Sequence, residues 1–183
     1  MNLQQYYHGL NSERLYLRKL THEDIPSWTE FYENNPNLKY LDIDLNRTNV
    51  AMATAWVDTQ INRYDKNEFG QLGIILKATD ELVGTVGFLM NEKCAADELA
   101  QAIIIKPPYW NHGIAWEASV LILNANFEHN WASSIFGFRH KDNILSQRFS
   151  QKLGFKDTEV IEEKNRTTIK FELTKEMWKH NFN

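Results

Sequence analysis

Apolar and polar positions recur along this chain with two different periods, which together predict a mixed α/β fold. Alternation or short β-branched runs predict strands at residues 14–20, 69–77, 81–90, 98–105, 134–139, 160–161 and 167–173. Helical spacing predicts helices at residues 21–32, about 48–64, 112–130 and 143–153, and a short one from Thr174. The predicted order is βααβββαβαββ with a C-terminal helix. Residues 1–12 show no clear period, so we expect a mobile or surface-lying lead-in.

The stretch from Glu98 to Ala118 contains the sharpest change of pattern. Its β-branched run is typical of a central strand buried on both faces and consists of Ile103, Ile104 and Ile105. Pro107 ends this strand because proline cannot donate to a sheet. The apolar helix that follows opens with unpaired N–H groups and a glycine, which makes the turn a candidate phosphate cradle. The alternative is an ordinary strand-to-helix turn that binds nothing.

Residues 108–118 read Pro-Tyr-Trp-Asn-His-Gly-Ile-Ala-Trp-Glu-Ala and resemble the acetyl-CoA-binding motif of the GNAT N-acetyltransferases. The resemblance is to the RimJ/RimL-like branch, which contains ribosomal-protein acetyltransferases. Residues 12–24 and 143–155, the latter ending in Lys-Leu-Gly-Phe, also resemble this branch. The likeness spans about residues 13–173. It implies the GNAT fold, an α/β fold with a central mixed, mostly antiparallel sheet flanked by helices, in a single domain over residues 1–183.

The resemblance also implies which residues bind acetyl-CoA. The backbone of the central strand would pair with the pantetheine arm, and the amides of the following turn would hold the pyrophosphate, with a further contact from His112 if it is protonated. Asn143 stands at a position that contacts the cofactor in the family, although it could instead serve only as a helix N-cap. The implied cofactor-binding residues are Ile103, Ile104, Ile105, Asn111, His112, Gly113, Ile114, Ala115, Asn143 and Ser146.

Two departures from the family pattern concern catalysis. Ser150 stands where many GNAT enzymes have a tyrosine, and its hydroxyl could protonate the departing thiolate; the alternative is a solvent-facing helix serine. Ala100 stands where the branch often has an acid, and Glu98, two residues earlier on the same strand face, is the candidate base. Glu117 is expected to be structural. No dedicated base is required, since positioning alone can supply much of the acceleration.

Composition and charge argue against several classes of function and of binding site. The 183 residues are 43% hydrophobic and 24% charged, as in an ordinary globular domain, and the formal charge of -4 argues against a nucleic-acid-binding surface. Cys94 is the one cysteine and the six histidines lack ligand spacing, so we expect no disulfide and no metal. No run is long enough to cross a bilayer, and no secretory pattern follows Met1. We therefore expect a cytoplasmic monomer or homodimer that needs no membrane.

The resulting hypothesis is an N-acetyltransferase that moves acetyl from acetyl-CoA to a primary amine, by direct attack in a ternary complex. The amine is a protein N-terminus or a small molecule, and the sequence does not say which. A different class, an inactive acetyl-CoA-binding sensor or interaction module, stays open because of the departures at Asn111, Ala100 and Ser150. A nucleotide-binding α/β domain is disfavoured, because the chain has neither a Walker lysine motif nor a full dinucleotide fingerprint.

Overall fold

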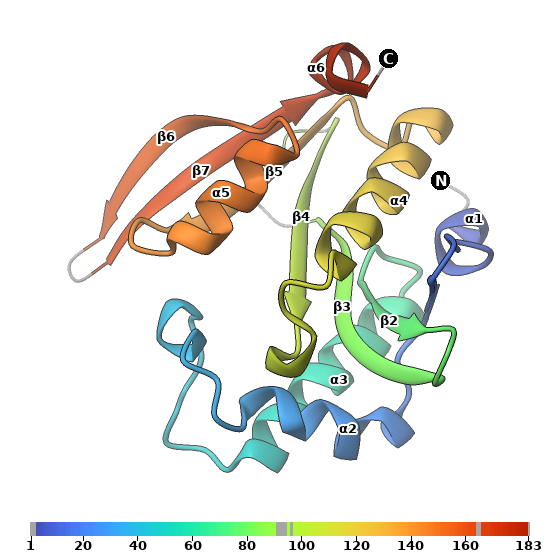
Figure 1. Cartoon of the computed structure of the whole chain (residues 1–183), viewed down its shortest axis with the longest axis vertical. Coiled ribbons are helices and arrows are strands. Elements are labelled where there is room, and N and C mark those ends of the chain that lie inside the picture. Colours follow the sequence, from blue (N-terminus) through green and yellow to red (C-terminus); the bar gives the residue numbers. More distant parts are fainter. Residues whose placement is uncertain (1–2, 91–94, 96, 164–165, 183) are drawn as a thin grey trace. The chain divides into compact units, whose positions relative to one another are not determined.

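The computed structural model describes the chain except for residues 1–2, 91–94, 96, 164–165 and 183, so Cys94 lies outside the described residues. The strands are β1 (Leu15–Arg18), β2 (Gln71–Leu76), β3 (Glu81–Leu89), β4 (Glu98–Ile105), β5 (Ser134–His140), β6 (Lys156–Glu163) and β7 (Arg166–Thr174) (Figure 1). The α-helices are α1 (Gln4–Tyr7), α2 (Ile25–Thr29), α3 (Asn49–Asp65), α4 (Ile114–His129), α5 (Ile144–Lys152) and α6 (Lys175–Phe182). Short 3-10 turns lie at His22–Asp24, Glu30–Tyr32, Leu38–Tyr40 and Pro107–Tyr109.

The strands form a seven-stranded mixed sheet in the order β1-β2-β3-β4-β5-β7-β6. Pairing is antiparallel between β1 and β2, β2 and β3, β5 and β7, and β6 and β7, whereas β4 and β5 pair in parallel. The predicted order of elements and the mostly antiparallel sheet are therefore confirmed. The helix α1 precedes this order and was not predicted.

Two compact units make up the chain. Unit 1 consists of residues Met1–Leu89 and Ala102–Ala125, and unit 2 consists of Met90–Gln101 and Asn126–Asn183. Both β4 and α4 therefore begin in one unit and end in the other.

The centre of unit 1 is the β2–β3 hairpin, in which nearly every residue is buried. Its register shifts where Ile74 pairs with Gly84 but Ile75 pairs with Leu82, which leaves one extra residue on β3. A side chain at Gly84 would bring its Cβ to 2.4 Å from the Ile104 carbonyl oxygen. Gly84 therefore stands next to a bulge and at a close approach of two backbones.

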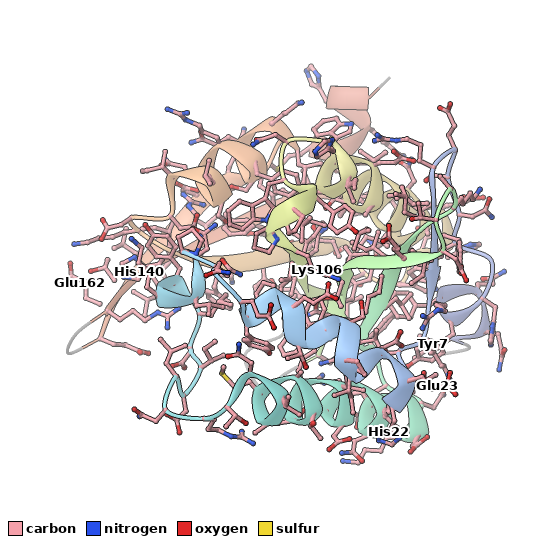
Figure 2. The ribbon with its side chains drawn as sticks, turned by 60° about the horizontal axis from the view of Figure 1, so that its bottom comes forward. Tyr7, His22, Glu23, Lys106, His140 and Glu162 are labelled. Carbon is pink, nitrogen blue, oxygen red and sulfur yellow. The ribbon has the colours of Figure 1, made fainter. Side chains whose placement is uncertain are left out.

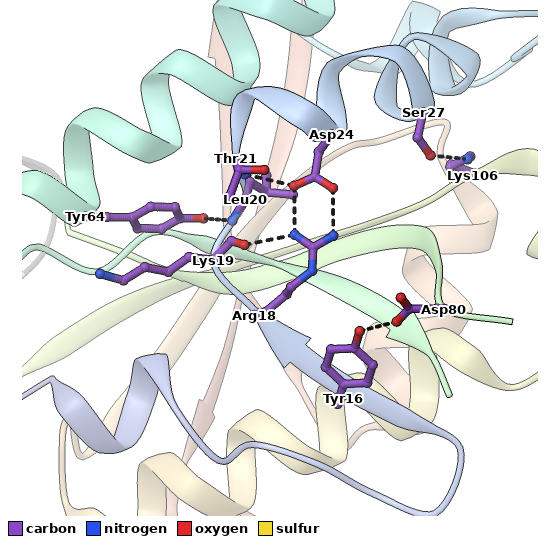
Figure 3. A network of polar contacts seen from close by, with 10 residues as sticks. All are labelled: Tyr16, Arg18, Lys19, Leu20, Thr21, Asp24, Ser27, Tyr64, Asp80 and Lys106. Atoms are coloured by element: carbon purple, nitrogen blue, oxygen red, sulfur yellow. Dashed lines mark hydrogen bonds and ion pairs between the residues drawn. The ribbon is translucent and has the colours of Figure 1, made fainter. Parts of the chain in front are cut away.

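The junction between β1 and α2 is held by Asp24. Its carboxylate accepts the backbone N–H of Thr21 at 2.8 Å, as part of a capping box, and receives two bonds of 2.8 Å from the Arg18 guanidinium (Figure 3). A bidentate arginine–carboxylate pair fixes direction as well as charge. The entry angle of α2 is therefore set by a strand residue six positions earlier.

Unit 2 is built on β5 and the β6–β7 hairpin, with α5 beside the strands (Figure 1). The helix α5 begins at Asn143, whose side-chain oxygen accepts the Ser146 N–H at 3.1 Å, and it ends before Gly154 at φ 90°. Apolar residues of these elements, including Ile135, Leu153 and Leu173, are buried. The cap that was the alternative role for Asn143 is present, and the predicted strands at residues 160–161 and 167–173 lie in the β6–β7 hairpin.

The expectation of a mobile or surface-lying lead-in is wrong for residues 3–7. Leu3, Tyr6 and Tyr7 are buried, and Tyr6 is 0% exposed. The Tyr6 hydroxyl donates to the Gly70 carbonyl at 2.5 Å and accepts the Phe88 N–H at 2.9 Å, so it joins the ends of β2 and β3. Four helical residues are too few to produce a detectable period, which is why the sequence pattern missed this element.

Candidate functional site

The last residues of β4 are less buried than the sequence predicted. Ile103, Ile104 and Ile105 are half-buried, so the expectation of a strand covered on both faces is wrong here. The β-branched run correctly predicts a strand, but it does not show which other elements pack against that strand. A half-covered strand end leaves backbone and side chains accessible next to the following turn.

The predicted end of the strand is confirmed. The Lys106 N–H donates to the Val83 carbonyl at 2.9 Å, and Pro107–Tyr109 then form a 3-10 turn. The Trp110 indole N–H donates back to the Ile105 carbonyl at 2.8 Å and closes the turn. The chain thus leaves the sheet within a few residues and enters the opening of α4.

The backbone between the turn and α4 has the geometry of an anion cradle. Asn111 has φ 64° and Gly113 has φ 77°, so two left-handed residues flank His112. Within the described residues, the N–H groups of Asn111, His112 and Gly113 donate no hydrogen bond. Successive free N–H groups in such a turn form an anion-binding concavity, and the positive end of a long helix adds to it. Asparagine is among the non-glycine residues enriched at such a positive φ, which suits Asn111 to this position.

The helix opening is also tied to the chain segment before β1. The Arg14 side chain donates from Nη1 to the His112 carbonyl at 3.0 Å and from Nε to Glu117 Oε2 at 2.7 Å. The Arg14 N–H and the Ser12 hydroxyl donate to the other oxygen of Glu117, at 3.0 and 2.6 Å. The structural role expected for Glu117 therefore has a specific form: it joins the first turn of α4 to the segment before β1.

The carboxyl group of Glu117 is held in its charged form. Burial raises the pKa of Glu117, but the hydrogen bonds from Ser12 and Arg14 and the charge of Arg14 outweigh burial, so the pKa lies below its usual value. A negative charge thus sits in the first turn of the helix whose opening forms the cradle, and Arg14 is its counterion.

Lys106 is a further charged residue at this end of β4, and sequence reasoning missed it (Figure 2). Its side chain is 3% exposed, with Nζ 3.2 Å from the Ser27 hydroxyl (Figure 3) and 2.5 Å from Glu30 Oε2. It therefore ties the end of β4 to α2 and the turn after it. A lysine directly after three isoleucines was the available signal, since a charge beside a strand end predicted to be buried needs a partner.

The remaining predicted site residues lie in unit 2. Asn143 caps α5 through its oxygen, and its side-chain NH₂ group has no partner within the described residues. Ser146 is half-buried in the first turn of the same helix. Asn143 therefore does cap the helix through its side-chain oxygen, while within the described residues its side-chain NH₂ group remains available to bond a ligand.

Ser150 is not the solvent-facing serine that was the alternative for this position. It is 3% exposed, its hydroxyl donates to the Gln147 carbonyl at 3.0 Å, and Arg139 Nη1 lies 3.5 Å from its oxygen. Arg139 is itself paired with Asp157 at 2.5 Å. No local pattern could have found this cluster, because the three side chains come from α5, β5 and β6.

The candidate base Glu98 is the first residue of β4. Its carboxylate accepts the Ala95 N–H at 3.1 Å, so one oxygen caps the turn before the strand. Ala100 is buried on the same strand.

Among the residues that the structure describes, no group of three or more histidine, cysteine, aspartate or glutamate side chains is placed to hold a metal. No helix in the described part of the chain is both long and apolar enough to span a membrane.

Comparison with known proteins gives matches in both sequence and fold. Residues 14–156 match the family model described as an acetyltransferase (GNAT) domain, which extends over parts of both units. An uncharacterized N-acetyltransferase of Bacillus subtilis, YoaA, is 28% identical over 153 residues, covering 83% of this chain and 85% of the relative.

Solved structures show the same fold. A GNAT-family acetyltransferase from Bacillus anthracis has a TM-score of 0.71 at 19% identity, covering 91% of this chain and 98% of that one. RimL, a ribosomal alpha-N-protein acetyltransferase solved with coenzyme A, has a TM-score of 0.77 at 13% identity, covering 89% of this chain and 95% of that one. The presence of RimL among the neighbours is consistent with the RimJ/RimL-like resemblance.

Proposed function

Because the chain belongs to the GNAT acetyltransferase family, we propose that it transfers acetyl from acetyl-CoA to a primary amine by direct attack in a ternary complex. The acceptor is a protein N-terminus or a small-molecule amine. The observation that carries the proposal is the turn before α4, directly after a half-buried strand end: it has two left-handed residues and three N–H groups without a partner among the described residues, a geometry that suits an anion.

The residues of unit 1 fit the phosphates and the arm of acetyl-CoA. The N–H groups from Asn111 to Ala115 would receive the pyrophosphate, and Gly113 keeps this surface free of a side chain. His112 is exposed at the helix opening, where a protonated ring would add a cation. The backbone of Ile103, Ile104 and Ile105, next to the cradle, would pair with the pantetheine arm. Ile114 and Ala115 begin the helix whose positive end faces the anion.

In unit 2, Asn143 and Ser146 would contact the pantetheine arm. The arm carries amide groups that need both donors and acceptors. Asn143 still has its side-chain NH₂ group to offer, and Ser146 adds a hydroxyl one turn along α5. Both residues are half-buried, which limits competition from water.

Bound acetyl-CoA supplies a thioester, and a neutral amine that attacks its carbonyl carbon becomes an amide as the thiol of CoA leaves. Ser150 would give the departing sulfur its proton: rotation about the Cβ–Oγ bond turns the O–H away from Gln147 while the oxygen stays 3.5 Å from Arg139, whose charge would stabilise the oxygen left behind. Glu98 would take the proton that the attacking amine loses, with the carboxylate oxygen that does not cap the turn.

We expect Ser150→Ala to lower kcat about 10-fold to 100-fold and to leave the affinity for acetyl-CoA unchanged within about twofold. The loss would follow from removal of the proton donor, because the smaller alanine fits the buried site. Steady-state kinetics and calorimetric binding measure the two quantities. Ser150→Cys keeps a proton donor of similar size and should retain most activity, whereas an unaltered kcat in Ser150→Ala would assign the serine to packing alone.

An acceptor screen tests the proposed function as a whole. The protein is incubated with acetyl-CoA and a panel of peptide N-termini, lysine peptides and small amines, and release of the CoA thiol is measured. Turnover with any member supports the enzyme. The alternative, an acetyl-CoA-binding sensor, is favoured by the Ser150 hydroxyl already bonded to Gln147 and by the buried Ala100; it predicts calorimetric binding with no turnover on any acceptor.

A further inference from the structure

Arg14 occupies a central position at the opening of α4. It lies just before β1, 103 residues from Glu117 in the sequence, yet its guanidinium joins the His112 carbonyl to the Glu117 carboxylate. His112 is the residue between the two left-handed positions of the cradle. A hydrogen bond to the His112 carbonyl therefore restrains the peptide plane between His112 and Gly113, which is part of the turn that shapes the anion site.

The charge of Arg14 acts on the same place. Glu117 Oε2 lies 2.6 Å from Arg14 Nη2, and Glu117 is in the first turn of α4. A carboxylate there interacts with the positive end of the helix dipole and repels any other anion at the helix opening. Pairing with Arg14 offsets the charge of Glu117, so a phosphate at the helix opening would meet less repulsion.

Arg14 also has donors to spare. Its side chain has five N–H groups, of which two hydrogen bonds and the ion pair with Glu117 engage three; within the described residues the other two have no partner, and the side chain is 46% exposed. A Cβ at Gly113 would lie 3.4 Å from Arg14 Nη2, which places the free donors beside the glycine of the cradle.

We propose that Arg14 is a positioning residue of the phosphate cradle: it holds the His112 peptide in place and neutralises Glu117, so that a CoA pyrophosphate can bind. The inference rests on the proposed function, because it assumes that acetyl-CoA is the ligand. A purely structural tie between β1 and α4 makes a different prediction. An ion pair this exposed contributes little to folding, so its removal should leave both stability and ligand binding nearly unchanged.

The experiment measures the binding of CoA, dephospho-CoA and pantetheine by calorimetry and competition. We expect Arg14→Met to weaken CoA about 30-fold and to leave pantetheine, which has no pyrophosphate, within about twofold. Dephospho-CoA, which lacks the 3′-phosphate, should show the same loss as CoA. Arg47→Met is the matched control, because Arg47 is an exposed arginine that also donates to a backbone carbonyl, Ala51 O at 3.2 Å; it should bind all three ligands normally.

Two further variants separate charge from positioning. Arg14→Met/Glu117→Gln removes the uncompensated carboxylate and should recover part of the lost CoA affinity, whereas Arg14→Lys keeps the charge without the fork that spans both partners and should be intermediate. Arg14→Lys also serves if Arg14→Met fails to fold.

Each outcome is decisive. Equal CoA affinity in the wild type and Arg14→Met overturns the inference alone. The inference also fails if Arg14→Met weakens pantetheine binding as much as CoA binding, or if it leaves dephospho-CoA binding unchanged. A wild type that binds no CoA at all overturns the proposed function together with the inference.

Discussion

Gly113→Val is expected to abolish acetyl-CoA binding, raising the Kd more than about 100-fold. The reason lies in the backbone rather than in a clash: an added Cβ at Gly113 would meet its nearest neighbour, Arg14 Nη2, at an ordinary 3.4 Å. Gly113 has φ 77°, and a β-branched residue at such an angle is a strong outlier. Valine would therefore pull the backbone out of the left-handed region and turn the cradle N–H groups away from the phosphate.

The matched control for this prediction is Gly9→Val. Gly9 also has a positive φ, 92°, and nothing lies within 4 Å of the position its Cβ would take. Both variants should lose about 1 to 2 kcal/mol of unfolding free energy from backbone strain. Only Gly113→Val should lose acetyl-CoA binding by calorimetry, and normal binding in that variant would show that the cradle is not the pyrophosphate site.

Gly84→Ala is expected to lower the free energy of unfolding by about 3 kcal/mol, at the upper end of what overpacking costs. The new Cβ would lie 2.4 Å from the Ile104 carbonyl oxygen and 3.1 Å from the Ile105 Cα, which are backbone atoms that cannot rotate away. The end of β4 would have to move from β3. Because this strand end is the proposed partner of the pantetheine arm, the folded fraction of Gly84→Ala should also bind acetyl-CoA more weakly.

Gly73→Ala is the control for Gly84→Ala. It adds the same methyl group to the neighbouring strand, at 3.0 Å from the tips of the Leu20 and Leu82 side chains, which can shift. Urea unfolding should therefore show a loss below about 1 kcal/mol for Gly73→Ala. Equal losses in the two variants would mean that the β3–β4 contact has no special role.

Regular elements with many residues were predictable from the sequence because their periods repeat. The apolar helix α4 and the capped helix α5 are both in the predicted places, and the β2–β3 and β6–β7 hairpins follow from strand-forming β-branched residues on either side of polar turns. The helix α1 was missed because burial of Tyr6 depends on Gly70 and Phe88, which lie far along the chain.

The candidate site was predictable where function is carried by consecutive residues. The turn at Asn111 and Gly113 could be read locally, since glycine and asparagine are the residues that tolerate positive φ. Side chains that converge from distant segments could not be read this way. Arg14 reaches His112, and Arg139 reaches Ser150 across the packing of α5 on β5, and neither pair leaves a local signal.

The contact between Arg14 and Glu117 also bears on the order in which the protein can form during synthesis. The segment before β1 leaves the ribosome early, but its partner in α4 is made 103 residues later, and Tyr6 likewise waits 82 residues for Phe88. Closing such long loops costs entropy that only later contacts repay. Neither element can therefore reach its final conformation co-translationally before its later partner has been made, which is Phe88 for the first helix and Glu117 for the cradle.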